Sequence, residues 1–164
     1  MSRNTTFMDC SPEDVFDILT DGWSYATWVV GAARIRSVDR EWPAPGSRIH
    51  HSVGAWPLLI SDYTEVEDLD EHREIRLRVR AWPTGEGIVV IHCVADGDRT
   101  RVVMEERAVS GPASLMPKPL QDLLLGPRNV EALRRLGYLA ESRARRHADN
   151  DDDGSVARTR KQGQ

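Results

Sequence analysis

The residues of this chain best suited to moving a proton are histidines and glutamates within predicted strands. His50 and His51 are neighbours on a strand expected over 47–56, so their side chains point to opposite faces. His51 alternates with Ile49 and Val53, and we expect it to face the interior. There an imidazole could anchor a polar group of a ligand or exchange a proton with it. A hydrogen-bonded core histidine without such a role, or an exposed one, is the alternative.

A second histidine lies in a more apolar setting. His92 falls in the predicted strand 87–95 and alternates with aliphatic residues such as Val90. An imidazole among valines needs a hydrogen-bonding partner. Tyr63, Glu105 or a ligand could supply that partner, so His92 is a second candidate for a ligand contact.

Adjacent glutamates form the third candidate. Glu105 and Glu106 stand next to each other on the last predicted strand, so one of them points inward. The pattern does not decide which one, and Glu105 is taken as the site candidate. A carboxylate in a cavity could act as a general base or hold a ligand. The alternative is a salt bridge on the outer face of the sheet with Arg76, Arg78 or Arg80.

Large aromatic residues stand near the expected ends of strands. The string AWP occurs twice, placing Trp56 and Trp82 at two strand ends before a proline. Rigid, amphipathic tryptophans suit the mouth of a pocket, and Tyr63 is a further candidate contact. Alternatively, each tryptophan covers the edge of the sheet where proline ends its strand.

These candidates depend on a sheet that a final helix covers. Five leucines recur at helical spacing within 117–145 and predict a helix there: Leu120, Leu123, Leu124, Leu133 and Leu136. Pro127 is expected to kink or restart this helix. The apolar stripe needs an apolar partner, and the strands upstream provide one. A sheet curled around one helix can leave a cavity, with Leu120 and Leu124 at its wall.

The elements follow one another in an order that predicts an α+β fold. A strand over 2–8 is followed by a helix over 12–20, which Ser11 caps, and by a second short helix near 23–28. Strands are then expected at 33–40, 47–56, 58–68, 73–82, 87–95 and 99–109. Short connections predict a curved antiparallel sheet of six or seven strands around the long C-terminal helix.

Composition narrows the partners. The chain has 164 residues and a formal net charge of −4, which argues against nucleic acid and anionic membranes. No apolar run approaches the ~20 residues of a membrane span, and no signal peptide is evident, so we expect a cytoplasmic protein. Cys10 and Cys93 are expected to be buried thiols. No metal-ligand spacing or cofactor fingerprint occurs, so neither a metal nor a cofactor is predicted. Oligomeric state cannot be read from the sequence.

The last residues differ from the rest. Residues 147–164 contain one large aliphatic residue, Val156, among many charged ones. Such a segment buries too little apolar surface to offset its ordering entropy. We therefore expect one domain over 1–146 and a disordered tail over 147–164.

Several strings in this order resemble the SRPBCC superfamily, and its polyketide cyclase/dehydrase-like branch in particular. They are SPEDVFDIL (11–19), WVVGA (28–32), GDRTRVVMEE (97–106), SGP (110–112) and RNVEALRRLGYLAE (128–141). The superfamily includes lipid-transfer START domains, plant Bet v 1 allergens and polyketide cyclases. The resemblance implies the helix-grip fold over about residues 2–145. It also implies that the short helices cap the open end of the sheet, which makes Trp23, Tyr25 and Trp28 lid or wall residues.

The sequence therefore favours a protein that binds a hydrophobic or aromatic small molecule, such as a lipid or a polyketide-like metabolite, between sheet and helix. One alternative is a polyketide aromatase/cyclase or dehydratase that uses His51, His92 or Glu105. A second alternative is a protein-interaction module whose basic strand, with Arg76, Arg78 and Arg80, meets an acidic partner. Fold alone does not decide among them.

Overall fold

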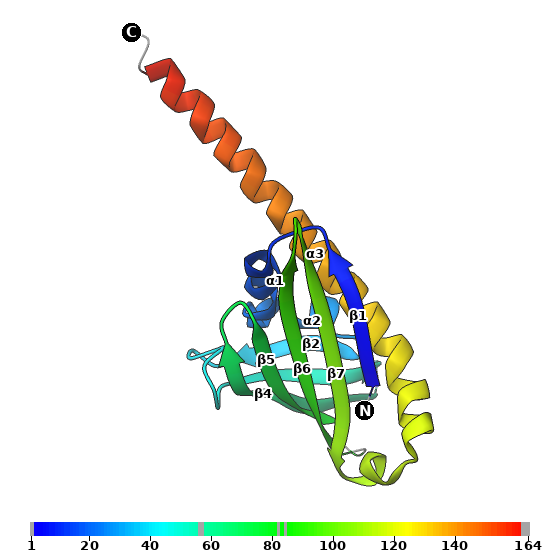
Figure 1. Cartoon of the computed structure of the whole chain (residues 1–164). Helices are drawn as coiled ribbons and strands as arrows, with labels where there is room; N and C mark the ends of the chain where they lie inside the picture. Colours follow the sequence, from blue (N-terminus) through cyan, green and yellow to red (C-terminus); the bar gives the residue numbers. More distant parts are fainter. Residues whose placement is uncertain (1, 56–57, 82, 84, 162–164) are drawn as a thin grey trace.

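A computed structural model describes residues 2–55, 58–81, 83 and 85–161. It leaves aside the side chains at positions 55, 58, 81, 113, 118, 121, 122, 124 and 149–161. Within this part of the chain, seven strands form one antiparallel sheet in the order β1-β7-β6-β5-β4-β3-β2. The strands are β1 (Ser2–Met8), β2 (Ala32–Val38), β3 (Arg48–Ala55), β4 (Leu58–Asp70), β5 (Glu74–Ala81), β6 (Gly85–Asp96) and β7 (Arg99–Ser110). Strands β2 to β7 form a meander, and β1 joins it beside β7 (Figure 1).

Two segments of helix follow β1 and lead back to the sheet. Helix α1 (Pro12–Leu19) begins with a capping box, in which Ser11 Oγ accepts from the Asp14 amide and the Asp14 carboxylate accepts from the Ser11 amide. A 3₁₀ turn, η1 (Gly22–Ser24), leads into the short helix α2 (Tyr25–Trp28). Tyr25 and Trp28 are buried, so α2 adds an aromatic wall next to the sheet.

The chain ends in one long helix, which η2 (Pro112–Leu115) precedes. Helix α3 (Lys118–Lys161) crosses the sheet, and its C-terminal part projects beyond the sheet (Figure 1). Leu133, Leu136 and Ala140 are buried in the core with Ile91 and Met104 of the sheet. We call the face of the sheet that α3 covers the inner face, and the opposite one the outer face.

One glycine permits strands β6 and β7 to approach each other closely. Gly85 opens β6 with a φ of +121°, a region that favours glycine. A Cβ atom there would lie 1.9 Å from the carbonyl oxygen of Ser110, at the end of β7. Any larger residue would push these two strands apart where they border the cavity.

The predicted fold class is confirmed: an antiparallel curved sheet, short helices after the first strand and a long C-terminal helix. Helix α3 continues past residue 146, where the sequence places the end of the domain, as far as Lys161. Helix α3 also runs through Pro127 without a break, so the predicted restart of the helix does not occur there. The predicted kink at Pro127 stays a prediction. The domain boundary itself stays a prediction. No helix in the described part of the chain is both long and apolar enough to cross a membrane.

Candidate functional site

A cavity of about 390 Å³ lies between the inner face of the sheet, helix α2 and the part of α3 from Leu125 to Ala132. Most of its wall is apolar, and the strands contribute many valines and small residues. Representative wall residues are Trp28, Val53, Val79, Val89, Met104 and Leu125. Alanine and glycine at other wall positions leave the space that larger side chains would fill. This is the cavity that the curl of the sheet around a helix predicts.

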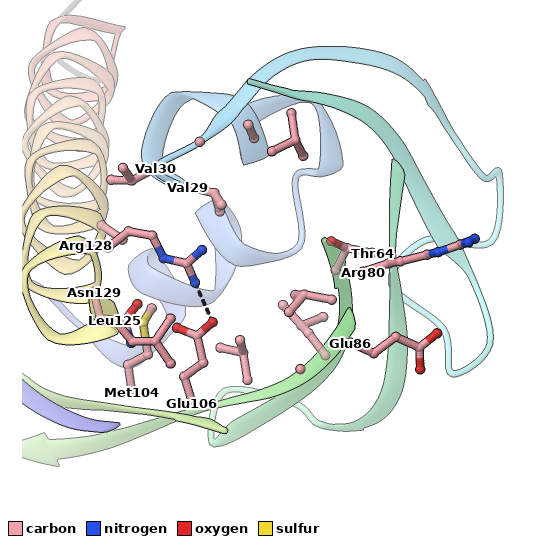
Figure 2. A pocket seen from close by; sticks show the side chains of 18 of the residues that line it. Val29, Val30, Thr64, Arg80, Glu86, Met104, Glu106, Leu125, Arg128 and Asn129 are labelled. Atoms are coloured by element: carbon pink, nitrogen blue, oxygen red, sulfur yellow. Dashed lines mark hydrogen bonds and ion pairs between the residues drawn. The ribbon is translucent and has the colours of Figure 1, made fainter. Parts of the chain in front are cut away.

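An ion pair crosses this apolar space. The Glu106 carboxylate on β7 accepts a hydrogen bond through Oε1 from the Arg128 guanidinium on α3, and Figure 2 shows the two side chains pointing toward each other. The Glu106 side chain is 6% exposed, and that of Arg128 is 40% exposed. The pair therefore connects the sheet to the helix, with its acidic end buried and its basic end partly open to solvent.

A chain of hydrogen bonds forms a second polar element of the wall. The Thr64 hydroxyl lies 2.8 Å from the Tyr25 hydroxyl and 3.1 Å from His51 Nε2. Burial raises the pKa of Tyr25 to about 12, so its phenol stays protonated. Burial also lowers the pKa of His51 below its usual value, so its imidazole is neutral near pH 7. The wall here is thus polar but uncharged.

Four residues that line the cavity carry a buried polar atom with no hydrogen-bonding partner in the described part of the chain. These atoms are Trp28 Nε1, His51 Nδ1, Glu106 Oε2 and Asn129 Nδ2. Buried polar atoms are nearly always hydrogen-bonded, and each exception needs an explanation. Because they gather around one cavity, its wall can offer these hydrogen bonds to whatever occupies the cavity.

His51 lies where strand alternation placed it. It is 3% exposed and lines the cavity, whereas its neighbour His50 lies on the outer face, 3.5 Å from the Asp39 carboxylate. Tyr25 and Trp28 also line the cavity, and their rings meet edge to face at 5.5 Å. The structure thus brings three of the predicted site residues together.

Two of the candidate site residues, His92 and Glu105, lie on the outer face of the sheet and outside the cavity wall. His92 faces outward, with Nδ1 3.0 Å from the Glu74 carboxylate, because the inward positions of β6 belong to Val89, Ile91 and Cys93. Both alternating sets of this strand are apolar, so periodicity could not separate them. Glu105 also faces outward and pairs with Arg3 at 3.4 Å, which leaves Glu106 as the inner glutamate.

The remaining predicted contacts lie elsewhere. Trp23 is 63% exposed and does not line the cavity. Tyr63 lies on the outer face, with the guanidinium carbons of Arg48 and Arg80 4.7 and 5.7 Å from its ring centre. Leu120 is 42% exposed and outside the cavity wall. Trp56, Trp82 and the side chain of Leu124 lie outside the described residues.

Sequence reasoning missed the polar residues that α3 and β4 contribute. Asn129 belongs to the same apolar stripe as Leu133, Leu136 and Ala140, so helical spacing placed it on the buried face. A polar residue within such a stripe is the signal that could have identified it. Thr64 precedes Val66 by two residues and so shares its inward face by strand alternation, and Arg128 precedes Ala132 by about one helical turn.

The cysteines offer no reactive thiolate. Cys10 and Cys93 are both buried, and burial raises each pKa to about 12. Among the described residues, no three His, Cys, Asp or Glu side chains are grouped in a way that could hold a metal ion.

Comparison with known proteins agrees with this architecture. A family model described as polyketide cyclase/dehydrase and lipid transport matches residues 2–141. No curated protein matches the chain. Among solved structures, protein NE0264 from Nitrosomonas europaea is 14% identical, with a TM-score of 0.66 over 85% of this chain and 93% of that one. A conserved protein from Geobacillus kaustophilus is 11% identical, with a TM-score of 0.66 over 85% and 94%.

A further solved structure is the di-domain ARO/CYC StfQ from the steffimycin biosynthetic pathway. It is 12% identical, with a TM-score of 0.65 over 90% of this chain and 51% of that one. The chain thus spans about half of that protein. At these identities, the likeness shows the fold alone.

Proposed function

We propose that this chain, which belongs to the polyketide cyclase/dehydrase and lipid transport family, binds a small hydrophobic or aromatic molecule in the cavity between its sheet and α3. The observation that carries the proposal is the cavity itself, about 390 Å³ with largely apolar walls and a few polar groups. Concave apolar sites with a few placed polar groups are typical of small-molecule sites.

The two kinds of wall contribute different things to binding. Burial of apolar surface supplies most of the affinity, at about 25 cal/mol per Å² before the costs of association. Glu106 and the Tyr25–Thr64–His51 chain supply orientation, because hydrogen bonds require defined geometry. Family membership supports a ligand-binding or polyketide-processing role. The family description, polyketide cyclase/dehydrase and lipid transport, makes a polyketide-like molecule the first ligand to test.

A variant that fills the cavity tests this proposal. Ala108 lies opposite Gly87 in the β6–β7 register, and both residues line the cavity. A tryptophan at position 108 would extend over Gly87, which has no side chain, and fill part of the cavity. We expect Ala108→Trp to weaken binding of a fluorescent hydrophobic probe by at least about ten-fold, which is about 1.4 kcal/mol.

The matched control is Val94→Trp, which adds the same ring on the outer face at a position 45% exposed. It should leave probe affinity unchanged. Circular dichroism should show that both variants fold. Equal affinity of the folded Ala108→Trp variant and the unmodified chain would contradict binding in this cavity.

An enzyme is the second candidate, and one observation favours it. Glu106 and His51, a carboxylate and a neutral imidazole, line the same cavity and both have an unpartnered buried atom within the described part of the chain. Such groups could move protons during an aromatase, cyclase or dehydratase reaction of a polyketide-like substrate. If so, Glu106→Gln or His51→Gln should reduce turnover by about 10²–10⁴-fold while substrate still binds. Product analysis that detects no turnover of such substrates would leave the binding role alone.

A further inference from the structure

The charges around the cavity restrict the charge of its ligand. Among the described residues, the charged side chains of the wall are Arg80, Glu86, Glu106 and Arg128. Arg80 and Glu86 stand at the rim and point away from the cavity in Figure 2, and Glu86 pairs with Arg78 at 3.2 Å. The interior therefore contains one cation and one anion, already paired with each other. A charged ligand would be buried without a counter-ion or would have to break this pair, and both are costly.

The hydrogen-bonding capacity of Glu106 restricts the ligand further. Oε1 accepts from Arg128, whereas Oε2 is buried and has no partner within the described residues. A carboxylate has only acceptors, so the missing partner is a donor. A ligand carboxylate, ether or ketone cannot donate, and a second carboxylate would also repel Glu106. A ligand ammonium can donate, but it would be buried beside the Arg128 guanidinium, which carries the same charge.

A hydroxyl group meets all these conditions. It carries no charge, it donates one hydrogen bond, and it accepts another. Both Trp28 Nε1 and Asn129 Nδ2 are donors on the cavity wall without a partner in the described part of the chain, and such a hydroxyl could accept from one of them. A single hydroxyl of the ligand would thus supply a hydrogen bond both to an acceptor and to a donor on the cavity wall.

We propose that the ligand of this cavity is a neutral hydrophobic molecule with a hydroxyl group that donates to the Glu106 carboxylate. This inference rests on the proposed function and names the chemical class that the site selects. It sets Glu106 as the residue that determines specificity: the site prefers phenols and alcohols over fatty acids and over ethers of the same shape. Arg128 pairs with the Glu106 carboxylate and orients it from the helix side.

Three probes with one ring system separate the possibilities: naphthol, its methyl ether and naphthoic acid. Isothermal titration calorimetry should show naphthol binding at least about ten-fold more tightly than either of the others, the usual worth of a hydrogen bond to a charged group. In Glu106→Gln, the amide both donates and accepts, so naphthol should lose most of its advantage over the ether. Naphthoate should gain affinity there, because Arg128 has lost its carboxylate. The control Glu105→Gln, on the outer face, should keep the ranking of the unmodified chain.

The outcomes distinguish this inference from the proposed function. If the unmodified chain binds the ether as tightly as naphthol, the inference is wrong while the cavity still binds hydrophobic molecules. If naphthoate binds most tightly, the site selects an anion and the inference is wrong. If none of the three probes binds the folded chain, the proposed function fails as well. Should Glu106→Gln not fold, the ranking on the unmodified chain decides alone.

Discussion

The inner and outer faces of the sheet use the same residue types in opposite ways. On the outer face, Glu105 pairs with Arg3, His92 lies beside Glu74, and Arg78 bridges two glutamates. On the inner face, Glu106 and His51 are buried, and each leaves one polar atom without a partner in the described residues. The polar side chains of the outer face have partners and are partly exposed to solvent. Those of the inner face are buried, and each lacks one hydrogen-bonding partner among the described residues.

This difference indicates which face of the sheet carries an energetic cost to the fold. An exposed ion pair contributes about 0–1 kcal/mol, so its loss changes little. A buried polar atom without a partner costs about 1–3 kcal/mol. Stability alone would favour apolar residues at both inner positions, and binding of the proposed ligand would explain why polar residues stand there instead. We therefore expect inner-face substitutions to change stability and binding, and outer-face substitutions to change neither by much.

The largest expected effect comes from the helix that closes the inner face. Leu136 on α3 is fully buried, so Leu136→Ala should lower the free energy of unfolding by about 2–5 kcal/mol through lost contacts and a residual cavity. Leu123→Ala on the same helix, where the side chain is 69% exposed, should change it by less than about 0.5 kcal/mol. Urea unfolding measures both. A cost below ~1 kcal/mol at Leu136 would mean that α3 does not seal the sheet.

The adjacent glutamates compare the two faces within one strand. Glu106→Ala removes the buried partner of Arg128, and we expect a loss of about 1–3 kcal/mol, moderated because Arg128 is 40% exposed. Glu105→Ala removes only an exposed ion pair and should cost less than about 0.5 kcal/mol. Both values come from urea unfolding at the same pH. Equal costs at the two positions would show that the inner pair is as well solvated as the outer one.

The histidine of the inner face should make stability depend on pH. Burial lowers the folded-state pKa of His51 below the unfolded value of about 6.5, so the unfolded chain binds the proton first as the pH falls. The contribution of His51 to the free energy of unfolding is therefore fully present above pH 6.5. It decreases as the pH falls from 6.5 toward the lowered pKa of the folded state. Its slope cannot exceed about 1.4 kcal/mol per pH unit. Unfolding free energies measured between about pH 7.5 and 5.5 should fall more for the unmodified chain than for His51→Gln, and parallel curves would refute this cause.

Strand positions were predictable where the two faces of a strand differ chemically. In β5, Ile75, Leu77 and Val79 alternate with arginines, and the predicted strand 73–82 agrees closely with the observed Glu74–Ala81. The capping box at Ser11 likewise predicted the start of α1 to the residue. In both cases a local rule and the final packing favour the same structure.

The site was less predictable because its geometry depends on contacts between distant segments. In β6 both faces are apolar, so the sequence could not tell that His92 faces outward. In β7 the choice between Glu105 and Glu106 follows from the register with β1 and β6. The partner of Glu106, Arg128, lies 22 residues further along on another element, and only the docking of α3 brings the two together.

The smallest expected effect tests the outer face and the rival role of its basic strand. Arg78 lies 2.5 Å from Glu67 and 3.2 Å from Glu86, and Arg76 lies 3.0 Å from Glu67. An acidic protein partner would have to displace these glutamates before it could use the arginines. A double-mutant cycle with Arg78→Gln and Glu67→Gln should give a coupling of at most about 1 kcal/mol. The coupling should disappear near 1 M salt, where the Debye length is about 3 Å. A coupling above ~2 kcal/mol that persists in salt would show that the ion pairs of the outer face are as strong as a buried pair. The contrast between the two faces would then be wrong.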